Sequence, residues 1–192
     1  MKDKNKGNTV SKQSKSWMEN ALIELMKTYK YEEITIQQLT DQAGLSRRTF
    51  YRNYSSKDEI LEDCFKKIWS EYELFTRQQK DLSLTNVARI FFTVMKKHVD
   101  FLNLVNQQGL LNIFILKMGN LLPEVFNELK GKDMPFSKEN IEYALTFSTG
   151  GFMLLLTRWF KDIPQKSPEE MAEIMGDIIF IANYQNPIKH SI

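Results

Sequence analysis

The stretch TIQQLTDQAGLSRRTFYRNYSSKDE, residues 35–59, decides the fold of this chain. Thr35 precedes an apolar-periodic run and Gln38 follows three residues later, the spacing of a capping box at a helix start. The helix that begins near Ile36 is expected to end at Gly44, because glycine takes a positive φ at low cost. The stretch therefore predicts a short helix and a tight turn, with a second helix directly after them.

The second helix is predicted to run from about Arg47 to Asn53, with Ser46 as a favourable N-cap. Phe50 and Tyr54, four residues apart, share one face and are expected in the core. Away from that face fall Arg47, Arg48, Tyr51 and Arg52. Three guanidiniums on one short exposed helix repel each other unless an anion lies nearby. We interpret the pair as a helix-turn-helix whose second helix enters the major groove of DNA.

A third helix is predicted to open at Ser56, with Glu59 placed as in a capping box. With these residues the stretch resembles the DNA-binding domain of TetR/AcrR-family transcriptional regulators. The resemblance is carried by Ile34-Thr35-Ile36, Ala43-Gly44-Leu45-Ser46, Thr49-Phe50-Tyr51, Tyr54 and Ser56-Lys57-Asp58-Glu59-Ile60. Tyr54 stands where Phe is more usual, and Arg48 where a small residue is common. The close match covers about residues 10–65, and the remainder resembles the family in helix count and layout.

Composition favours an all-α cytoplasmic protein. The chain has 192 residues, 42% of them hydrophobic, and only eight Gly and five Pro, which fits long helices with few turns. Its single cysteine, Cys64, excludes an internal disulfide framework and fits a reducing compartment. No signal peptide and no apolar run long enough to span a bilayer is visible. Residues 1–57 carry 11 Lys/Arg against 6 Asp/Glu, which suggests nucleic acid at one end of the molecule.

Helical periodicity predicts about nine helices in three segments. Residues 1–10 are expected to form a flexible basic tail, residues 11–57 the helix-turn-helix domain, and residues 58–192 a ligand-binding and dimerisation domain. The remaining helices are predicted at about 12–29, 57–79, from Ser83 to Lys97, around 101–105, and at 110–130, 138–161 and from Pro168 onward. Ser83, Ser137 and Ser167 are the expected N-caps of three of them, and a stop is expected at Gln107-Gln108-Gly109. The first helix is predicted to bury one stripe that contains Trp17, Ala21, Leu22, Leu25 and Tyr29. A loop is expected at 131–135. The helix at 57–79 begins beside the helix-turn-helix and continues into the ligand-binding and dimerisation domain. It is therefore the candidate element for transmitting a conformational change between the two.

Two kinds of DNA contact are predicted within the helix-turn-helix. Arg47, Arg48 and Arg52 are the candidates for reading base edges, since arginine paired with guanine is the commonest specific contact. The candidates for phosphate contacts are Thr35, Ser46, Thr49, Tyr51 and Lys57, which lie at helix starts or on the exposed edge. The lysines of the tail either add non-specific affinity or only improve solubility.

Dimerisation and an effector site are predicted for the body. The resemblance implies a homodimer through the last two helices, with candidate interface residues Gly151, Leu155, Ile174 and Ile178; core packing is the alternative explanation. The resemblance also implies an effector cavity for a small apolar or aromatic molecule, lined by Phe91, Met95, His98, Phe101, Phe114, Met118 and Phe147. A filled core is again the alternative.

The sequence contains no recognisable catalytic motif. Two histidines and one cysteine cannot build a His/Cys metal cluster, and no phosphate loop or nucleophile elbow is present. No cofactor or metal is therefore expected. We read the chain as a ligand-responsive transcriptional regulator, a repressor that binds a palindromic operator on double-stranded DNA as a dimer. The alternative is a DNA-binding activator or co-regulator controlled by a protein partner.

Overall fold

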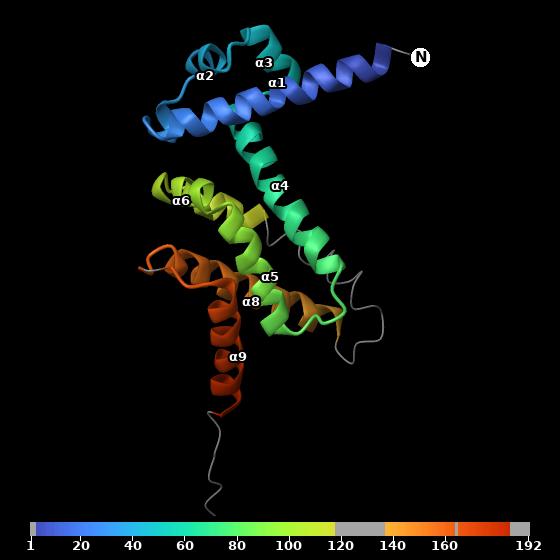
Figure 1. Cartoon of the computed structure of the whole chain (residues 1–192), viewed down its shortest axis with the longest axis vertical. Helices are drawn as coiled ribbons and strands as arrows, with labels where there is room; N and C mark the ends of the chain where they lie inside the picture. Colours follow the sequence, from blue (N-terminus) through green and yellow to red (C-terminus); the bar gives the residue numbers. More distant parts are fainter. Residues whose placement is uncertain (1–2, 118–136, 164, 185–192) are drawn as a thin grey trace, which may run out of the picture. The chain divides into compact units, whose positions relative to one another are not determined.

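The computed structural model describes residues 3–117, 137–163 and 165–184, and every regular element in these ranges is a helix (Figure 1). The prediction of an all-α fold is confirmed. The chain divides into two compact units. The N-terminal unit contains residues 1–67 and 100–114, and the C-terminal unit contains residues 68–99 and 115–192. No helix in the described ranges is long and apolar enough to cross a membrane.

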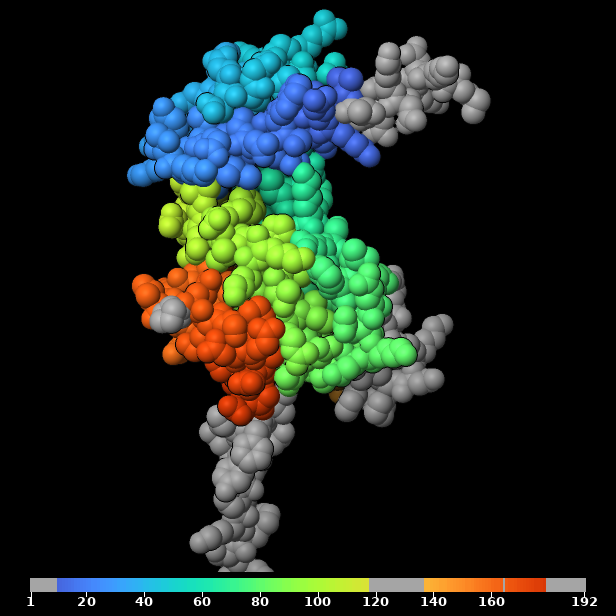
Figure 2. Space-filling model, viewed as in Figure 1, coloured from blue at the N-terminus to red at the C-terminus, as the bar shows by residue number. Residues whose placement is uncertain are grey.

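Three helices form the base of the N-terminal unit: α1 (Asp3–Met26), α2 (Ile36–Ala43) and α3 (Arg47–Asn53). Figure 1 shows α2 and α3 on the same side of α1, and Figure 2 shows the blue and cyan atoms of these helices in continuous contact. Their largest fully buried side chains are Met18, Leu22, Met26, Leu39 and Phe50. Burying one such side chain contributes about 1.5–3 kcal/mol, so this core holds α3 firmly against its neighbours.

Helix α1 differs from its prediction in two respects. It begins at Asp3, within the segment expected to be an irregular tail. Its buried stripe passes through Ser14 and Met18, whereas Trp17, predicted to be buried, is 45% exposed. Ala21, Leu22 and Leu25, predicted on the same stripe, are buried. Tyr29, also predicted on the stripe, follows the last residue of α1 and is 43% exposed.

Helix α4 (Lys57–Arg77) contributes to both units, because the division falls between Lys67 and Ile68. In the N-terminal unit the ring of Phe65 lies 6.0 Å from Phe101 of α6 (Val99–Gln107) and 5.1 Å from Phe114. A 3-10 turn, η1 (Tyr31–Glu33), connects α1 to α2. The predicted stop after α6 is confirmed at Gly109, which has a φ of 72°.

The C-terminal unit contains α5 (Leu84–Lys97), α8 (Lys138–Trp159) and α9 (Pro168–Tyr184). Their predicted caps are confirmed, since the hydroxyl groups of Ser83, Ser137 and Ser167 each accept a bond from a backbone N–H three residues later. Helix α9 packs against α5, as the orange-red and yellow-green atoms show in Figure 2. Aromatic rings build the core, with centroids 5.1 Å apart for Phe91 and Phe152 and 5.5 Å apart for Phe92 and Trp159.

Candidate nucleic-acid interface

Two caps and one glycine shape the turn between α2 and α3. Thr35 accepts a bond from the backbone N–H of Gln38, and the Gln38 side chain accepts one from the N–H of Thr35, so the predicted capping box is confirmed. Gly44 ends α2 in the left-handed region with a φ of 65°, which a residue with a Cβ adopts only under strain. Ser46 then caps α3 by accepting from the N–H of Thr49 at 3.1 Å. These local bonds set the direction in which α3 leaves the turn.

Helix α3 buries one face and leaves the other in solvent. Phe50 is fully buried and Tyr54 is 3% exposed, as the four-residue spacing predicted. Arg47, Arg48 and Arg52 are exposed. Among the described residues, none forms a hydrogen bond or ion pair with these three guanidiniums. Tyr51 lies on the same exposed side, with 55% of its surface accessible. The helix therefore presents concentrated and unpaired positive charge.

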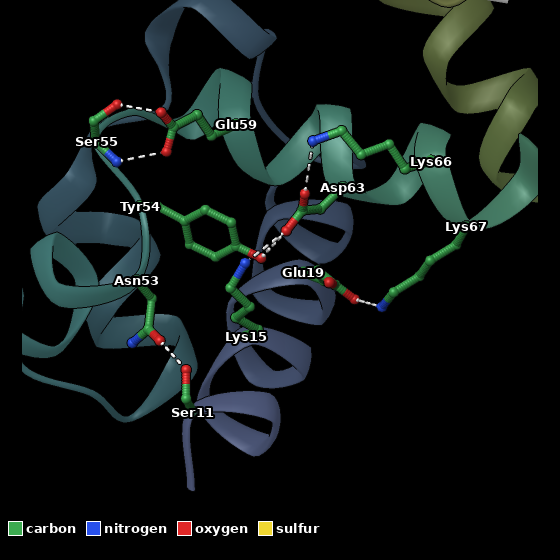
Figure 3. Close-up of polar contacts among 10 residues, drawn as sticks. All are labelled: Ser11, Lys15, Glu19, Asn53, Tyr54, Ser55, Glu59, Asp63, Lys66 and Lys67. Carbon is green, nitrogen blue, oxygen red and sulfur yellow. Dashed lines mark hydrogen bonds and ion pairs between the residues drawn. The ribbon is translucent and has the colours of Figure 1, made fainter. Parts of the chain in front are cut away.

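A polar network fastens α3 to α1 and α4 (Figure 3). The Asn53 side chain accepts a bond from Ser11 at 2.6 Å and donates one to the carbonyl of Thr49. The Tyr54 hydroxyl donates to the Asp63 carboxylate, which also binds the Lys15 ammonium at 2.8 Å. These contacts fix the orientation of α3 as well as its position, which a base-reading helix requires.

Charges in this network shift two pKa values. Burial would raise the pKa of Asp63, but hydrogen bonds and the positive charges of Lys15 and Lys66 outweigh it and lower that pKa below its ordinary value. Burial, together with the Asp63 and Glu19 charges, raises the pKa of the Tyr54 hydroxyl. Asp63 therefore stays a carboxylate and Tyr54 stays a protonated donor at neutral pH.

Lys57, predicted to contact phosphate, forms hydrogen bonds within the N-terminal unit. Its ammonium donates to the carbonyls of Tyr31, Glu32 and Ile34 at 2.5, 3.1 and 2.8 Å. It also lies 4.6 Å from the centre of the Tyr31 ring. Burial lowers the pKa of Lys57, although nearby acids oppose the shift. A phosphate contact by Lys57 stays a prediction, and it would require the ammonium to leave at least one of these carbonyls.

The other predicted phosphate contacts divide by exposure. Thr35 and Ser46 are exposed, while their side-chain oxygens already accept bonds within the caps. Thr49 is half-buried, with its hydroxyl 3.0 Å from that of Ser46. The Thr35 hydroxyl and backbone N–H both donate to the Gln38 side-chain oxygen, and the Thr49 N–H donates to the Ser46 hydroxyl oxygen. A phosphate contact by Thr35 would therefore require one of its bonds to Gln38 to open. Tyr51, also in this set, is 55% exposed.

Gln108 is a structural residue of this unit whose contacts the sequence did not indicate. Its amide donates to the carbonyls of Met26 and Tyr29 at 2.8 and 3.1 Å and accepts from the N–H of Tyr31 at 2.9 Å. The end of α1 and the start of η1 are thereby bonded to the residue that follows α6. The partners lie 77 to 82 positions away along the chain, so no local pattern signals the contact.

The residues predicted to line an effector cavity are divided between the two units. Phe91 and Met95 are buried and His98 bonds Glu71 at 2.7 Å in the C-terminal unit. Phe114 is buried and Phe101 half-buried in the N-terminal unit. Met118 lies outside the described residues. Phe147 is 83% exposed and so does not line a cavity here.

A cavity of about 290 Å³ lies instead between α8 and α9 of the C-terminal unit. Its lining includes three of the residues predicted for the dimer interface, namely Leu155, Ile174 and Ile178. The fourth, Gly151, is exposed on α8. No group of His, Cys, Asp and Glu side chains within the described part of the chain is arranged to hold a metal ion.

Comparison with known proteins identifies relatives of both units. A family profile described as bacterial regulatory proteins of the tetR family matches residues 20–64, and a profile for the C-terminal region of transcriptional regulators matches residues 83–180. No curated protein matches the chain.

Two solved structures share the fold. One is a TetR transcriptional regulator from Streptococcus agalactiae 2603V, 19% identical, with a TM-score of 0.63 over 92% of this chain and 99% of that one. Another is the dihydroxyacetone kinase operon activator DhaS, 16% identical, with a TM-score of 0.57 over 88% of this chain and 95% of that one.

Proposed function

Because the chain belongs to the TetR family of transcriptional regulators, we propose that it is a ligand-responsive repressor that binds a palindromic operator as a homodimer. The observation that carries DNA binding is the exposed face of α3. Arg47, Arg48 and Arg52 lie there with no intramolecular partner among the described residues, on a helix whose opposite face is fully buried. Duplex DNA supplies both the phosphate charge and the guanine edges that such side chains bind.

Dimerisation follows from the size of α3. A seven-residue helix reads only a few base pairs, so specificity requires a second copy on a half-site about one helical turn of DNA away. A two-fold dimer and a palindromic operator therefore imply each other.

Regulation is proposed to pass through α4. This helix is continuous from Lys57, whose ammonium holds the segment before α2, to Arg77 in the C-terminal unit. A molecule that favours one arrangement of α4 needs to supply only roughly 1–3 kcal/mol of coupling to change operator affinity.

A second candidate function is activation controlled by a protein partner. Phe91, Met95 and Phe114, predicted to line an effector cavity, are almost fully buried in packed cores, which favours this candidate. DhaS, which shares the fold, is itself described as an operon activator. Ligand-induced melting shifts separate the two candidates, since a small effector raises the melting temperature of the protein alone.

We place the protein in the cytoplasm, where its operator DNA lies, and assign it no enzymatic activity. Its one thiol, Cys64, is buried, and burial raises the pKa of that thiol to about 12. An unreactive protonated thiol is compatible with a reducing compartment.

The proposal is tested by fluorescence anisotropy with a labelled duplex from the DNA upstream of the coding sequence. We expect Arg47→Ala, Arg48→Ala and Arg52→Ala each to weaken binding by about tenfold or more. A variant that loses a phosphate contact should also reduce the salt slope by about one, whereas loss of a base contact relaxes sequence preference. Lys138→Ala on α8 removes an exposed positive charge in the other unit and is the control. Unchanged binding in all three arginine variants overturns the assignment of α3.

A further inference from the structure

The exposed residues of α3 lie at different angles around the helix axis from the buried Phe50. Successive residues of an α-helix are turned by about 100°, so Arg48 and Arg52 each lie about 160° from the fully buried Phe50. By the same count, Arg47 and Tyr51 lie about 60° and about 100° from Phe50, both on one flank. Arg48 and Arg52 therefore form the side of α3 opposite the core.

Contacts within the N-terminal unit hold both flanks of α3. On one flank, the Asn53 side chain accepts a bond from Ser11 of α1 and donates one to the carbonyl of Thr49 (Figure 3). On the other flank, the Tyr51 ring packs edge-on against Phe50, with the ring centroids 5.1 Å apart. Between the flanks, the two arginine side chains are exposed and have no bonding partner among the described residues.

The major groove of DNA offers different atoms to the flanks and to the far side of an inserted helix. The groove is about 12 Å wide and a helix with its side chains is about 10–12 Å across, so the flanks of the helix meet the phosphate walls. The side opposite the core faces the base edges on the groove floor. Arg48 and Arg52 are therefore placed to read bases, and Arg47 and Tyr51 to contact phosphates.

Guanine is the base that an arginine on the far side of α3 recognises. The O6 and N7 atoms of guanine both accept hydrogen bonds, and the guanidinium fork donates to both at once. Adenine presents N7 beside an amino group that is itself a donor, and a guanidinium has no acceptor for it. Like charges four residues apart also destabilise a helix, and α3 contains no acidic residue that offsets its arginines. Guanine edges supply the acceptors that the two guanidiniums lack within the chain.

We propose that Arg48 and Arg52 are the specificity-determining residues, and that each reads one guanine in every operator half-site. The two residues are about 6 Å apart along the helix axis, and stacked base pairs are about 3.4 Å apart. A half-site therefore contains two G·C pairs that are about two base-pair steps apart. This inference rests on the proposed operator binding and names the bases that α3 selects.

Selection from a library of randomised duplexes tests the predicted half-site. The full-length protein should enrich duplexes whose half-sites contain the two G·C pairs at this spacing. Replacing either pair by A·T should weaken binding of the unmutated protein by about tenfold or more in fluorescence anisotropy. Replacing either guanine by 7-deazaguanine, which keeps the base pair but lacks the N7 acceptor, should also weaken binding.

Measuring each variant against each altered duplex assigns the two arginines. In Arg48→Ala the penalty for changing one G·C pair should vanish while the penalty for the other remains, and Arg52→Ala should show the reverse. Arg47→Ala is the matched control, which should weaken binding to all duplexes equally and reduce the salt slope by about one. Circular dichroism checks that each variant is folded.

Charge-conserving variants separate base reading from general attraction to DNA. Arg48→Lys keeps the positive charge but loses the bidentate fork, so it should lose discrimination at its G·C pair. Arg47→Lys makes the same change on the flank and should keep discrimination at both pairs. Equal discrimination in these two variants would overturn the assignment of Arg48.

The outcomes separate the inference from the proposed function. If the protein selects a palindrome but only Arg47→Ala removes a base preference, the assignment is wrong and the function stands. Selected half-sites without the two G·C pairs would overturn the inference in the same way. If no duplex is enriched over random DNA, the proposed sequence-specific regulator fails and the inference fails with it.

Discussion

At the scale of single residues, the partly buried charges of Lys57 and Asp63 show how the N-terminal unit is held together. Each charge has partners from elements distant in sequence: Lys57 bonds carbonyls before α2, and Asp63 bonds Lys15 of α1. Removing either partner leaves polar groups in the interior without a bond, which costs more than the net gain of an ordinary hydrogen bond.

Lys57→Met should destabilise the protein by about 1–2 kcal/mol, because three carbonyls lose a charged donor in a partly exposed site. Lys66→Met makes the same change on the same helix, where the side chain is 65% exposed, and should change stability little. Denaturant unfolding measures both. Equal effects of the two substitutions would show that the carbonyl contacts contribute nothing specific.

Asp63 should make stability depend on pH in the acidic range. Its pKa is lower in the folded state, so its contribution is present above the unfolded value of about 4 and is lost as pH falls through the folded value. Other carboxylates share this behaviour, so the relevant quantity is a difference. We expect the stability gap between the unmutated protein and Asp63→Asn to shrink from pH 7 to pH 3. A gap that stays constant over this range contradicts the shift.

At the scale of elements, the side-chain amide of Gln108, the residue after α6, bonds the end of α1 and the segment that follows it. One amide satisfies two carbonyls and one N–H at the point where α1 ends. The position of the α1 end therefore depends on the residue after α6.

Gln108→Ala should lower stability by about 1–3 kcal/mol and speed hydrogen exchange at the Tyr31 amide, whose acceptor is removed. Gln107→Ala changes the exposed neighbour and is the control. Gln108→Glu keeps an acceptor for Tyr31 but loses both donors, so it should protect the Tyr31 amide better than alanine does. Identical exchange in all variants would exclude this contact in solution.

At the scale of the whole molecule, DNA binding by the N-terminal unit is expected to depend on residues of the C-terminal unit that never touch DNA. Ile178→Glu should split the dimer, because it places a charge at the apolar lining of the α8–α9 cavity, and should leave most helix content unchanged. Affinity for the full palindrome should then fall to that for a half-site, while half-site binding stays the same.

Circular dichroism, sedimentation and anisotropy with full and half operators check this prediction together. Glu173→Lys, at an exposed position of the same helix, is the matched control. Loss of half-site binding in Ile178→Glu would indicate unfolding or direct damage and not loss of the partner.

Local features of the sequence determined the helices and the exposed arginine-bearing face of α3. The caps at Thr35, Ser46, Ser83 and Ser137 and the turn at Gly44 were predicted correctly, because their bonds join residues at most three or four positions apart. The exposed and buried faces of α3 followed from helical spacing for the same reason.

Only the tertiary structure decided which side chains of these helices are buried by other elements and which residues they contact there. Trp17 was predicted to be buried and is exposed, and Phe147 was expected in a cavity and faces solvent, since periodicity gives a helix an apolar face without saying what covers it. The roles of Lys57 and Gln108 were equally unreadable, because their partners lie 23 to 82 residues away. Hydrogen bonds within one helical turn depend on sequence spacing alone, whereas contacts between elements exist only after the chain has brought those elements together.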